Sequence, residues 1–365
     1  MMTDSSVFSP GHRTPRPRVS KTSRAKRLRQ SGGFVGLVLL VTGLWLASLA
    51  LGSVAIPLPD VVAILLGGTP SQPAWQDIVL QFRLPRAITA AVAGSALAIS
   101  GLQLQALFRN PLVGPSLLGV NAGASLGVAL VVLAGNIAGL SLAAPVTQIG
   151  LVGAASLGAG ITLGVVLLVA HRVRSSLALL IFGLMFGYAA TALVTILLHF
   201  SQAEEAMAYL NWTFGSFAGV TWSQLPILLP LVALGLTMAL VCCKSLNVLL
   251  LGEEQARSLG VAIALVQGYL IFSSALLAGA VTAFCGPIAF LGVAVPHLCR
   301  SLFGTLDHRI LVPASVLLGM TLALAADLIA QLPGSQTVLP LNAVTALIGA
   351  PILIWLMLKR LRLFF

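Results

Sequence analysis

The sequence predicts an all-α polytopic membrane protein of about ten transmembrane helices, with both termini in the cytoplasm. The first observation is the composition: of 365 residues, 58% are hydrophobic and only 8% are charged, whereas soluble proteins carry about 25% charged residues. The second is the recurrence of apolar runs of about 20 residues, the length that a helix needs to cross a bilayer. The third is the placement of the basic residues, which fall almost entirely in alternate loops.

Residues 1–33 are expected to form a disordered, basic tail, because they are rich in Ser, Thr and Pro and show no hydrophobic periodicity. Eight of the twenty Lys and Arg residues fall in this tail: Arg13, Arg16, Arg18, Lys21, Arg24, Lys26, Arg27 and Arg29. A net charge of +11 also suits a nucleic-acid binder. The other basic residues stand almost singly in short loops, so we expect the tail to set topology and contact anionic lipid, with no nucleic-acid partner.

Residues 34–365 are expected to form one transmembrane domain. The candidate spans are 34–54, 84–107, 115–134, 146–170, 177–199, 224–243, 261–283, 287–303, 309–331 and 341–358. The first run has 21 residues and exceeds the roughly 7–15 of a signal peptide's apolar core, so it is interpreted as a retained helix. The segments 55–83 and 201–222 carry polar residues and tryptophans and are expected outside the membrane.

The positive-inside rule tests this layout. With the N-terminus in the cytoplasm, eighteen of the twenty basic residues lie on the inner side, and only Arg83 and Arg86 lie outside. An incorrect helix count would scramble this asymmetry.

Three residues near the second span recur 185 positions later in the chain. Gly94, Gly101 and Pro111 correspond to Gly279, Gly286 and Pro296. Because the two sets lie on helices of opposite direction, an inverted repeat around a central pathway accounts for them. Ordinary packing of glycine-rich helices accounts for them equally well.

No catalytic motif is present in the sequence. It contains no phosphate-binding loop, no H-E-x-x-H and no nucleophile elbow, and its five histidines are scattered. The four cysteines show no C-x-x-C spacing, so buried apolar positions are expected rather than a metal site. Asp327 is the one acid at membrane depth, where such residues are functional candidates. A helix-end acid that simply reaches water accounts for it equally well.

Carboxylates are too sparse for the proton relay of a secondary transporter, so a separate ATPase is the expected source of energy. The polar inner loop 249–260, L-L-L-G-E-E-Q-A-R-S-L-G, is the expected contact with that subunit. It could form a short helix–turn–helix, and a passive linker remains the alternative. A stand-alone channel or secondary transporter is the rival function.

Several longer motifs follow one another from residue 80 onward. They are R-L-P-R-A-I-T-A-A-V-A-G-S-A-L-A-I-S-G-L-Q-L-Q-A-L-F-R-N-P-L (83–112), G-E-E-Q-A-R-S-L-G (252–260), G-P-I-A-F-L-G-V-A-V-P-H-L-C-R (286–300), D-H-R (307–309) and L-I-G-A-P (347–351). In this order they resemble the permease subunits of bacterial ABC importers for iron chelates and cobalamin. The resemblance implies a homodimer in the bacterial inner membrane, two ATPase subunits beneath it and a periplasmic substrate-binding protein above. It implies no catalytic residue and no cofactor in this subunit, because ATP and Mg²⁺ act in the ATPase.

The resemblance also implies roles for single residues. Arg83 and Arg86 match arginines that pair with glutamates of the binding protein, and Gln331 stands where many relatives have a third arginine. Simple snorkelling of the two arginines is the alternative. The inner gate positions are Asn110, Leu112, Ser175 and Ser176. The positions facing the ATPase are Glu253, Glu254, Gln255 and Arg257.

The helix expected over 177–199 would face the translocation path. It carries Met185, Tyr188 and Thr191 and no Lys, Arg, Asp or Glu, which suits transient passage of a bulky, mostly apolar chelate. Among iron chelates this favours haem slightly over a ferric siderophore, and cobalamin is the alternative substrate.

Overall fold

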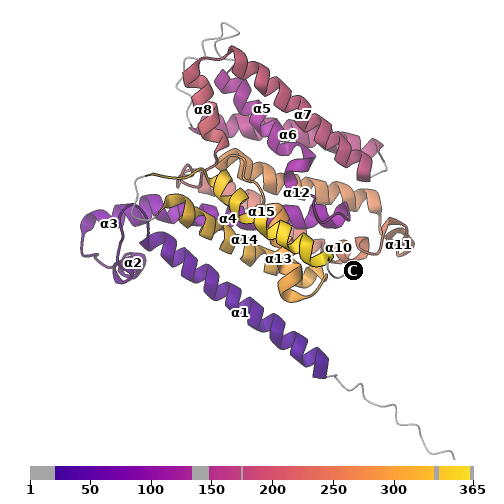
Figure 1. The fold of residues 1–365 in the computed structure, drawn as a ribbon, viewed down its shortest axis with the longest axis horizontal. Coiled ribbons are helices and arrows are strands. Elements are labelled where there is room, and N and C mark those ends of the chain that lie inside the picture. Colours follow the sequence, from indigo (N-terminus) through magenta and orange to yellow (C-terminus); the bar gives the residue numbers. More distant parts are fainter. Residues whose placement is uncertain (1–20, 134–147, 174–175, 333–336, 362–365) are drawn as a thin grey trace, which may run out of the picture.

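The computed structural model describes residues 21–133, 148–173, 176–332 and 337–361, and within these ranges it is helical, with no β-strand. Two groups of helices are visible in Figure 1. One group, at the top, holds α5 (Val120–Leu133), α6 (Gln148–Arg172), α7 (Ser176–Phe200) and α8 (Ala203–Thr213). The other is built around α4 (Leu84–Leu107), α12 (Ile263–Cys285) and α14 (His308–Gln331).

The N-terminal region differs from the expected one at both ends of the first helix. α1 (Lys21–Ala50) begins inside the tail that was expected to be disordered, because Lys, Arg, Ala, Leu and Gln are good helix formers and extend the apolar helix. It also ends four residues before the predicted boundary at 54. Short helices α2 (Leu58–Leu65) and α3 (Pro73–Asp77) follow, and a π-helix, η1 (Ile78–Arg83), leads directly into α4.

The remaining helices follow the predicted order with shorter third and eighth spans. A 3₁₀ turn, η2 (Pro115–Leu118), precedes α5, because Gly119 takes a positive φ of 76°. α13 (Leu291–Phe303) begins late, after Gly286 (φ 74°) and Phe290 (φ 67°) break the helix. α9 (Leu225–Val241) bends by 56° into α10 (Cys243–Leu249). α11 (Glu253–Ser258) and α15 (Leu341–Leu361) complete the described chain.

The helix lengths agree with a multi-pass protein of about ten spans. Among the described residues, six helices are long and apolar enough to cross a membrane, and the bent pair α9–α10 makes a seventh. Three shorter apolar helices account for the other expected spans: Val120–Leu133, Leu291–Phe303 and Leu341–Trp355.

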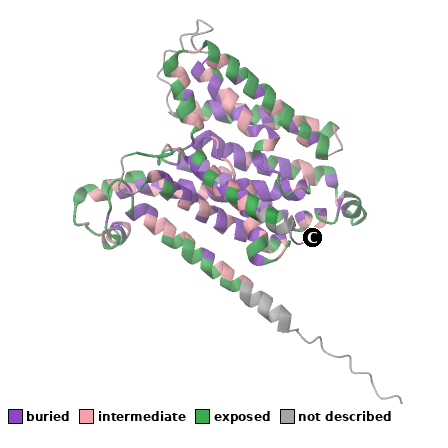
Figure 2. Cartoon of the chain, in the orientation of Figure 1, coloured by how far each residue is buried: buried purple, intermediate pink, exposed green. Residues whose placement is uncertain are grey.

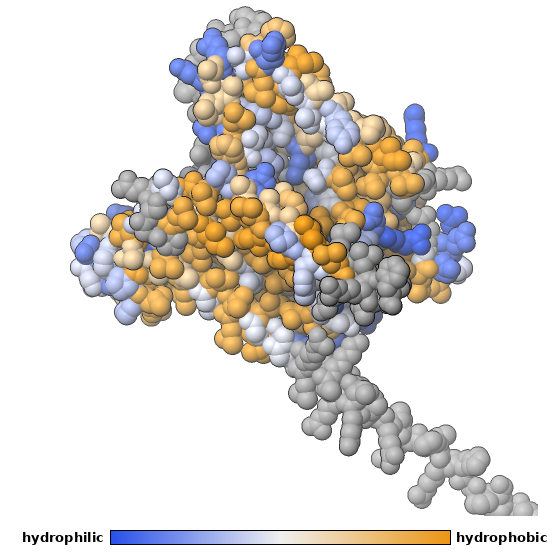
Figure 3. Space-filling model, viewed as in Figure 1, coloured by the Kyte–Doolittle hydropathy of each residue, from blue (hydrophilic) through white to orange (hydrophobic). Residues whose placement is uncertain are grey.

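Burial places α4 at the centre of the bundle. In the span Pro73–Leu107, which contains α4, 83% of the most apolar 18-residue stretch is buried. The corresponding stretches of α1 and α7 are only 22% buried (Figure 2). The peripheral helices therefore present apolar side chains outward, and the space-filling view shows hydrophobic residues over much of the visible face (Figure 3). Such a surface is stable in lipid and not in water.

Glycines allow α4 to approach its neighbours at backbone distance. A Cβ added to Gly94 would lie 2.2 Å from the Gly319 carbonyl oxygen on α14. A Cβ added to Gly101 would lie 1.7 Å from the Gly292 carbonyl oxygen on α13. Helix association in membranes depends on close van der Waals packing of this kind, because lipid supplies no hydrophobic driving force between helices.

Part of the helix packing follows an inverted repeat, and one of the three residue pairs fits it. α4 packs on α14 as α12 packs on α6, and α5 contacts α6 and α7 as α13 contacts α14 and α15. Gly94 faces Gly319 on α14, and Gly279 faces Ala159 on α6. The other two pairs do not occupy equivalent places: Gly101 lies inside α4 while Gly286 follows the end of α12, and Pro111 lies in a loop while Pro296 lies inside α13.

The first prediction concerns the close contact at Gly101. We expect Gly101→Ala to destabilise the protein by about 1–3 kcal/mol, because overpacking forces the two helices apart. Gly164→Ala in α6 is the matched control, because nothing lies within 4 Å of an added Cβ there and Ala favours a helix over Gly. Thermal unfolding in detergent, followed by size-exclusion chromatography, measures both. Equal midpoints for the two variants would contradict the assigned contact.

Candidate functional site

Arg83 is buried at the outer end of the bundle, and only 8% of the residue is exposed. Its Nη1 donates to the carbonyl oxygens of Leu49 and Ala50 at 2.8 and 2.9 Å, and its Nη2 donates to the Val54 carbonyl. The bonds to Leu49 and Ala50 satisfy carbonyls in the last turn of α1 that have no helical partner, and the Val54 carbonyl lies in the turn that follows. The side chain therefore does not project outward as the sequence analysis expected, and it offers no surface to a partner's carboxylate in this conformation.

Gly52 makes room for this arginine. A Cβ added at Gly52 would lie 2.8 Å from Nη2 of Arg83. The chain thus turns after α1 around the guanidinium, which explains why the first helix ends at Ala50 rather than at residue 54.

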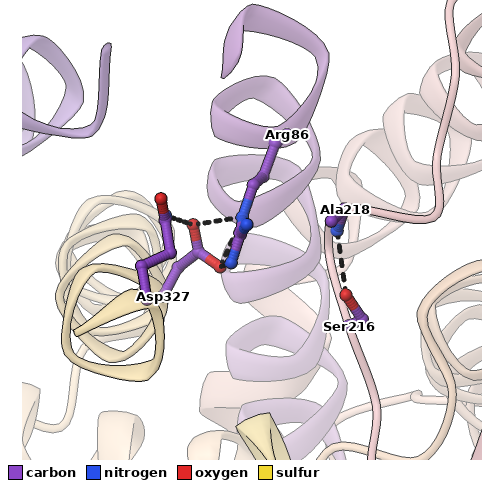
Figure 4. Close-up of polar contacts among 5 residues, drawn as sticks. Arg86, Ser216, Ala218 and Asp327 are labelled. Carbon is purple, nitrogen blue, oxygen red and sulfur yellow. Dashed lines mark hydrogen bonds and ion pairs between the residues drawn. The ribbon is translucent and has the colours of Figure 1, made fainter. Parts of the chain in front are cut away.

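Arg86 faces a different helix from Arg83. Its Nε donates to both carboxylate oxygens of Asp327 at 3.0 Å, and its Nη2 donates to Oδ1 at 2.8 Å (Figure 4). Gln331, one turn further along α14, donates from Nε2 to Oδ2 of Asp327 at 2.8 Å. The Asp327 side chain is 2% exposed and that of Arg86 is 17% exposed. The carboxylate is thus neutralised by its neighbours, while the arginine side chain stays partly exposed.

A cavity of about 250 Å³ lies at the outer side, between the N-terminal end of α6, α8 and the C-terminal end of α12. Its lining is mainly apolar, with the amides of Asn211 and Gln224 and the indole of Trp212 among the polar groups. Sites for drug-sized ligands are usually about 300–1,000 Å³. The cavity is therefore too small to enclose a bulky chelate by itself.

The three residues predicted to line the path share an exposed face of α7. Met185 is 51% exposed and Tyr188 is 64% exposed. Thr191 is exposed too, and its hydroxyl donates to the Gly187 carbonyl at 2.9 Å. A threonine that bonds its own helix in this way presents a mostly apolar surface, so the face suits lipid, a second copy of the chain or a mostly apolar substrate.

The predicted segment 249–260 holds a turn and one short helix, so the expected helix–turn–helix is complete only together with α10, which lies before this range. α10 ends at Leu249, Gly252 turns the chain with a φ of 112°, and α11 begins at Glu253. The side chains of Glu254, Gln255 and Arg257 are exposed. Glu253 opens α11, and its side chain lies outside the described set.

Asn247 fastens this segment to the start of α14. Its Nδ2 donates to Oδ1 of Asp307 at 2.7 Å, and its Oδ1 accepts from the His308 backbone N–H at 2.8 Å. Asp307 also caps α14 by accepting from the Arg309 N–H at 3.0 Å. These bonds hold the pKa of Asp307 below its ordinary value. The cap therefore stabilises the fold above the ordinary carboxyl pKa and is lost as the pH falls through the lowered one.

The residues predicted to form the inner gate are only partly described. Asn110 and Leu112 lie in the loop after α4, where Oδ1 of Asn110 accepts from the Leu112 N–H at 3.0 Å and Leu112 is 46% exposed. Ser176 is the first residue of α7, and Ser175 lies outside the described residues. Within the described ranges, no group of three or more His, Cys, Asp and Glu side chains could hold a metal ion.

Sequence reasoning missed the partners of the residues it selected. Asp327 was flagged for its depth, but its bond to Arg86 joins residues 241 positions apart. Asn247, His297 and Arg300 had no assigned role, although the last two lie inside a family motif. The motif at 286–300, which had no assigned role, was the sequence signal that pointed to His297 and Arg300.

The second prediction tests the structural role of Arg83. We expect Arg83→Gln to lower stability by roughly 1.5–3 kcal/mol, the usual range for a hydrogen bond to a charged group. Gly52→Ala should also lower it, because the new methyl group displaces the guanidinium. Gly43→Ala in α1 meets open space and serves as the control. Thermal unfolding in detergent reports the order, and an Arg83→Gln variant as stable as the control would contradict it.

Comparison with known proteins agrees with this architecture. The model of the FecCD transport family matches residues 38–359. The vitamin B12 import system permease protein BtuC of Escherichia coli O127:H6 is 38% identical over 297 residues, covering 81% of this chain and 88% of the relative. BtuC of Salmonella typhi is 38% identical over 286 residues, covering 78% and 84%.

A solved structure is similar over most of both chains. It is described as an inward-facing conformation of a metal-chelate type ABC transporter, and it is similar with a TM-score of 0.78 and 32% identity, over 89% of this chain and 98% of the other. The match of fold, family model and relatives covers nearly all of the helices described above. The chain belongs to the FecCD transport family and is a multi-pass permease of the ABC importer type.

Proposed function

We propose that this chain is the translocation subunit of an ATP-driven importer that moves a bulky metal chelate from the periplasm to the cytoplasm across the bacterial inner membrane. The observation that supports the proposal best is that protein side chains occupy the Asp327 carboxylate with hydrogen bonds. Arg86 binds this carboxylate with two nitrogens, and Gln331 binds it with a third. A carboxylate held in this way is a poor carrier for a coupled proton or sodium ion.

Energy then comes from outside the subunit. The exposed face of α11, with Glu254, Gln255 and Arg257, offers charged and amide groups to an ATPase on the inner side. We propose that one such ATPase subunit binds here on each of two copies of the chain, with ATP and Mg²⁺ acting in the ATPase and no cofactor in this chain. The bond network of Asn247 supports this use, because it ties the segment to the start of α14.

The path itself requires a second copy of the chain. The outer cavity is too small for a chelate, whereas the face of α7 with Met185 and Tyr188 is exposed and without charge. Two such faces across a two-fold axis would enclose a channel of mostly apolar character. A homodimer is therefore proposed, with peripheral helices such as α1, whose apolar stretch is mostly unburied, facing lipid.

Cobalamin is the substrate that we propose as the leading candidate, and haem is the second candidate. Cobalamin is placed first because relatives at 38% identity are vitamin B12 permeases. Haem is placed second because the exposed α7 face is apolar, and a ferric siderophore is the third choice. The test measures ATP hydrolysis by the reconstituted complex, with its binding protein, for each of the three ligands. Stimulation by none of them would contradict the chelate class.

The third prediction concerns docking of the periplasmic binding protein. We propose that the partly exposed Arg86 guanidinium donates to a carboxylate of that partner, with Gln331 beside it. The double variant Arg86→Gln with Asp327→Asn removes the ion pair and leaves no buried charge unpaired. We expect it to weaken association at least tenfold, about 1.4 kcal/mol, and to reduce its salt dependence.

Gln76→Glu is the control for this experiment, because it adds a charge to an exposed position of the outer helix α3. Affinity in nanodiscs across a salt series measures both variants. Wild-type affinity and salt dependence in the double variant would mean that Arg86 serves the fold alone.

A further inference from the structure

The motif Gly286–Arg300 has no role in the function proposed above. The structure places its C-terminal part, on α13, against the inner end of α4 and the loop 108–114 that follows. We call this loop the gate loop, because it contains Asn110 and Leu112.

Two hydrogen-bonded ties join α13 to this region. Nε2 of His297 lies 2.9 Å from the carbonyl oxygen of Pro111. A carbonyl oxygen can only accept, so the imidazole donates from Nε2. Nη1 of Arg300 donates to Oε1 of Gln105 at 2.7 Å, and Nε2 of Gln105 donates to the Val293 carbonyl at 3.3 Å. The first tie holds the gate loop, and the second holds the end of α4.

Close packing reinforces the ties. A Cβ added to Gly114 would lie 2.7 Å from Cγ2 of Val293, and one added to Gly292 would lie 2.6 Å from Cδ of Pro115. The loop also has a fixed internal shape, since Asn110 bonds the Leu112 N–H in an Asx turn. Arg109 holds a positive φ of 47°, which costs energy in a residue with a side chain. The position of the whole loop therefore depends on its attachment to α13.

The other side of the gate loop meets the α10–α11 segment. Nη1 of Arg109 lies 3.4 Å from the place where a Cβ on Gly252 would sit. The far end of α13 leads to Asp307 and His308, which Asn247 binds from α10. The gate loop is thus connected to this segment directly through Arg109 and indirectly through α13.

We propose that His297 is the positioning residue of the inner gate. Its Nε2–H···O bond to Pro111 fixes the gate loop on α13, so that the loop moves with α13 when the ATPase displaces the α10–α11 segment. The word gate rests on the proposed import function, whereas the attachment and its test do not.

The test compares two amides at position 297. The amide nitrogen of His297→Gln reaches the place of Nε2 and keeps the bond, whereas that of His297→Asn is one methylene shorter and loses it. A spin label on Leu112→Cys reports the motion of the gate loop in the full-length protein in nanodiscs. The native cysteines are at most 8% exposed, so labelling is selective for the introduced thiol. His171→Asn, an exposed histidine at the inner end of α6, is the matched control.

We expect the label to tumble at least threefold faster in His297→Asn, and at the parent rate in His297→Gln and His171→Asn. Thermal unfolding of each variant shows that the fold persists. Equal label mobility in the Asn and Gln variants would overturn the proposal, whether both are rigid or both are mobile. No substrate or ATPase is needed, so this result is independent of whether the import function stands.

Discussion

The close contacts of α4 with α13 and α14 are the constraint on which the rest of the structure depends. At Gly101 and Gly94 the backbones meet without intervening side chains, so the three helices form one tightly packed unit in the centre of the bundle. Polar residues that bond to neighbouring helices lie at or beside each end of α4. Arg83 and Arg86 lie at the outer end, and Gln105 lies near the gate loop at the inner end. A shift of α4 relative to α13 and α14 would therefore move the outer arginines and Gln105 together.

Each charged group inside the bundle has a protein partner that offsets the free-energy cost of placing a charge in lipid. Arg83 satisfies carbonyls that end α1, and Arg86 pairs with Asp327. The buried Asp327 carboxylate is left with no unmet hydrogen-bonding need, and such a need would cost several kcal/mol in a bilayer. The same hydrogen bonds limit what Asp327 can do, because a carboxylate that is fully occupied by protein donors cannot also bind and release an ion.

The hydrophobic pattern predicted most of the fold, since span length is set by the thickness of the membrane. The helix at 84–107 has the predicted bounds. The polar segment at 249–260 forms a turn and the short helix α11, while the helix before the turn, α10, starts outside the predicted range. The directions of single side chains were not predictable. Arg83 and Arg86 are three apart, which predicts one shared face, but Arg83 ends a π-helix and faces α1 while Arg86 faces α14. Partners such as Asp327 and His297 depend on tertiary packing, which spacing along the chain does not encode.

The source of energy is the most direct test of this account. The permease, its ATPase and its binding protein are reconstituted in proteoliposomes, and uptake of labelled cobalamin and haem is measured with proton and sodium gradients collapsed. The account predicts that uptake of the true substrate continues at its full rate with ATP and stops with a non-hydrolysable analogue. Uptake that follows an imposed ion gradient in the absence of ATP hydrolysis would contradict it.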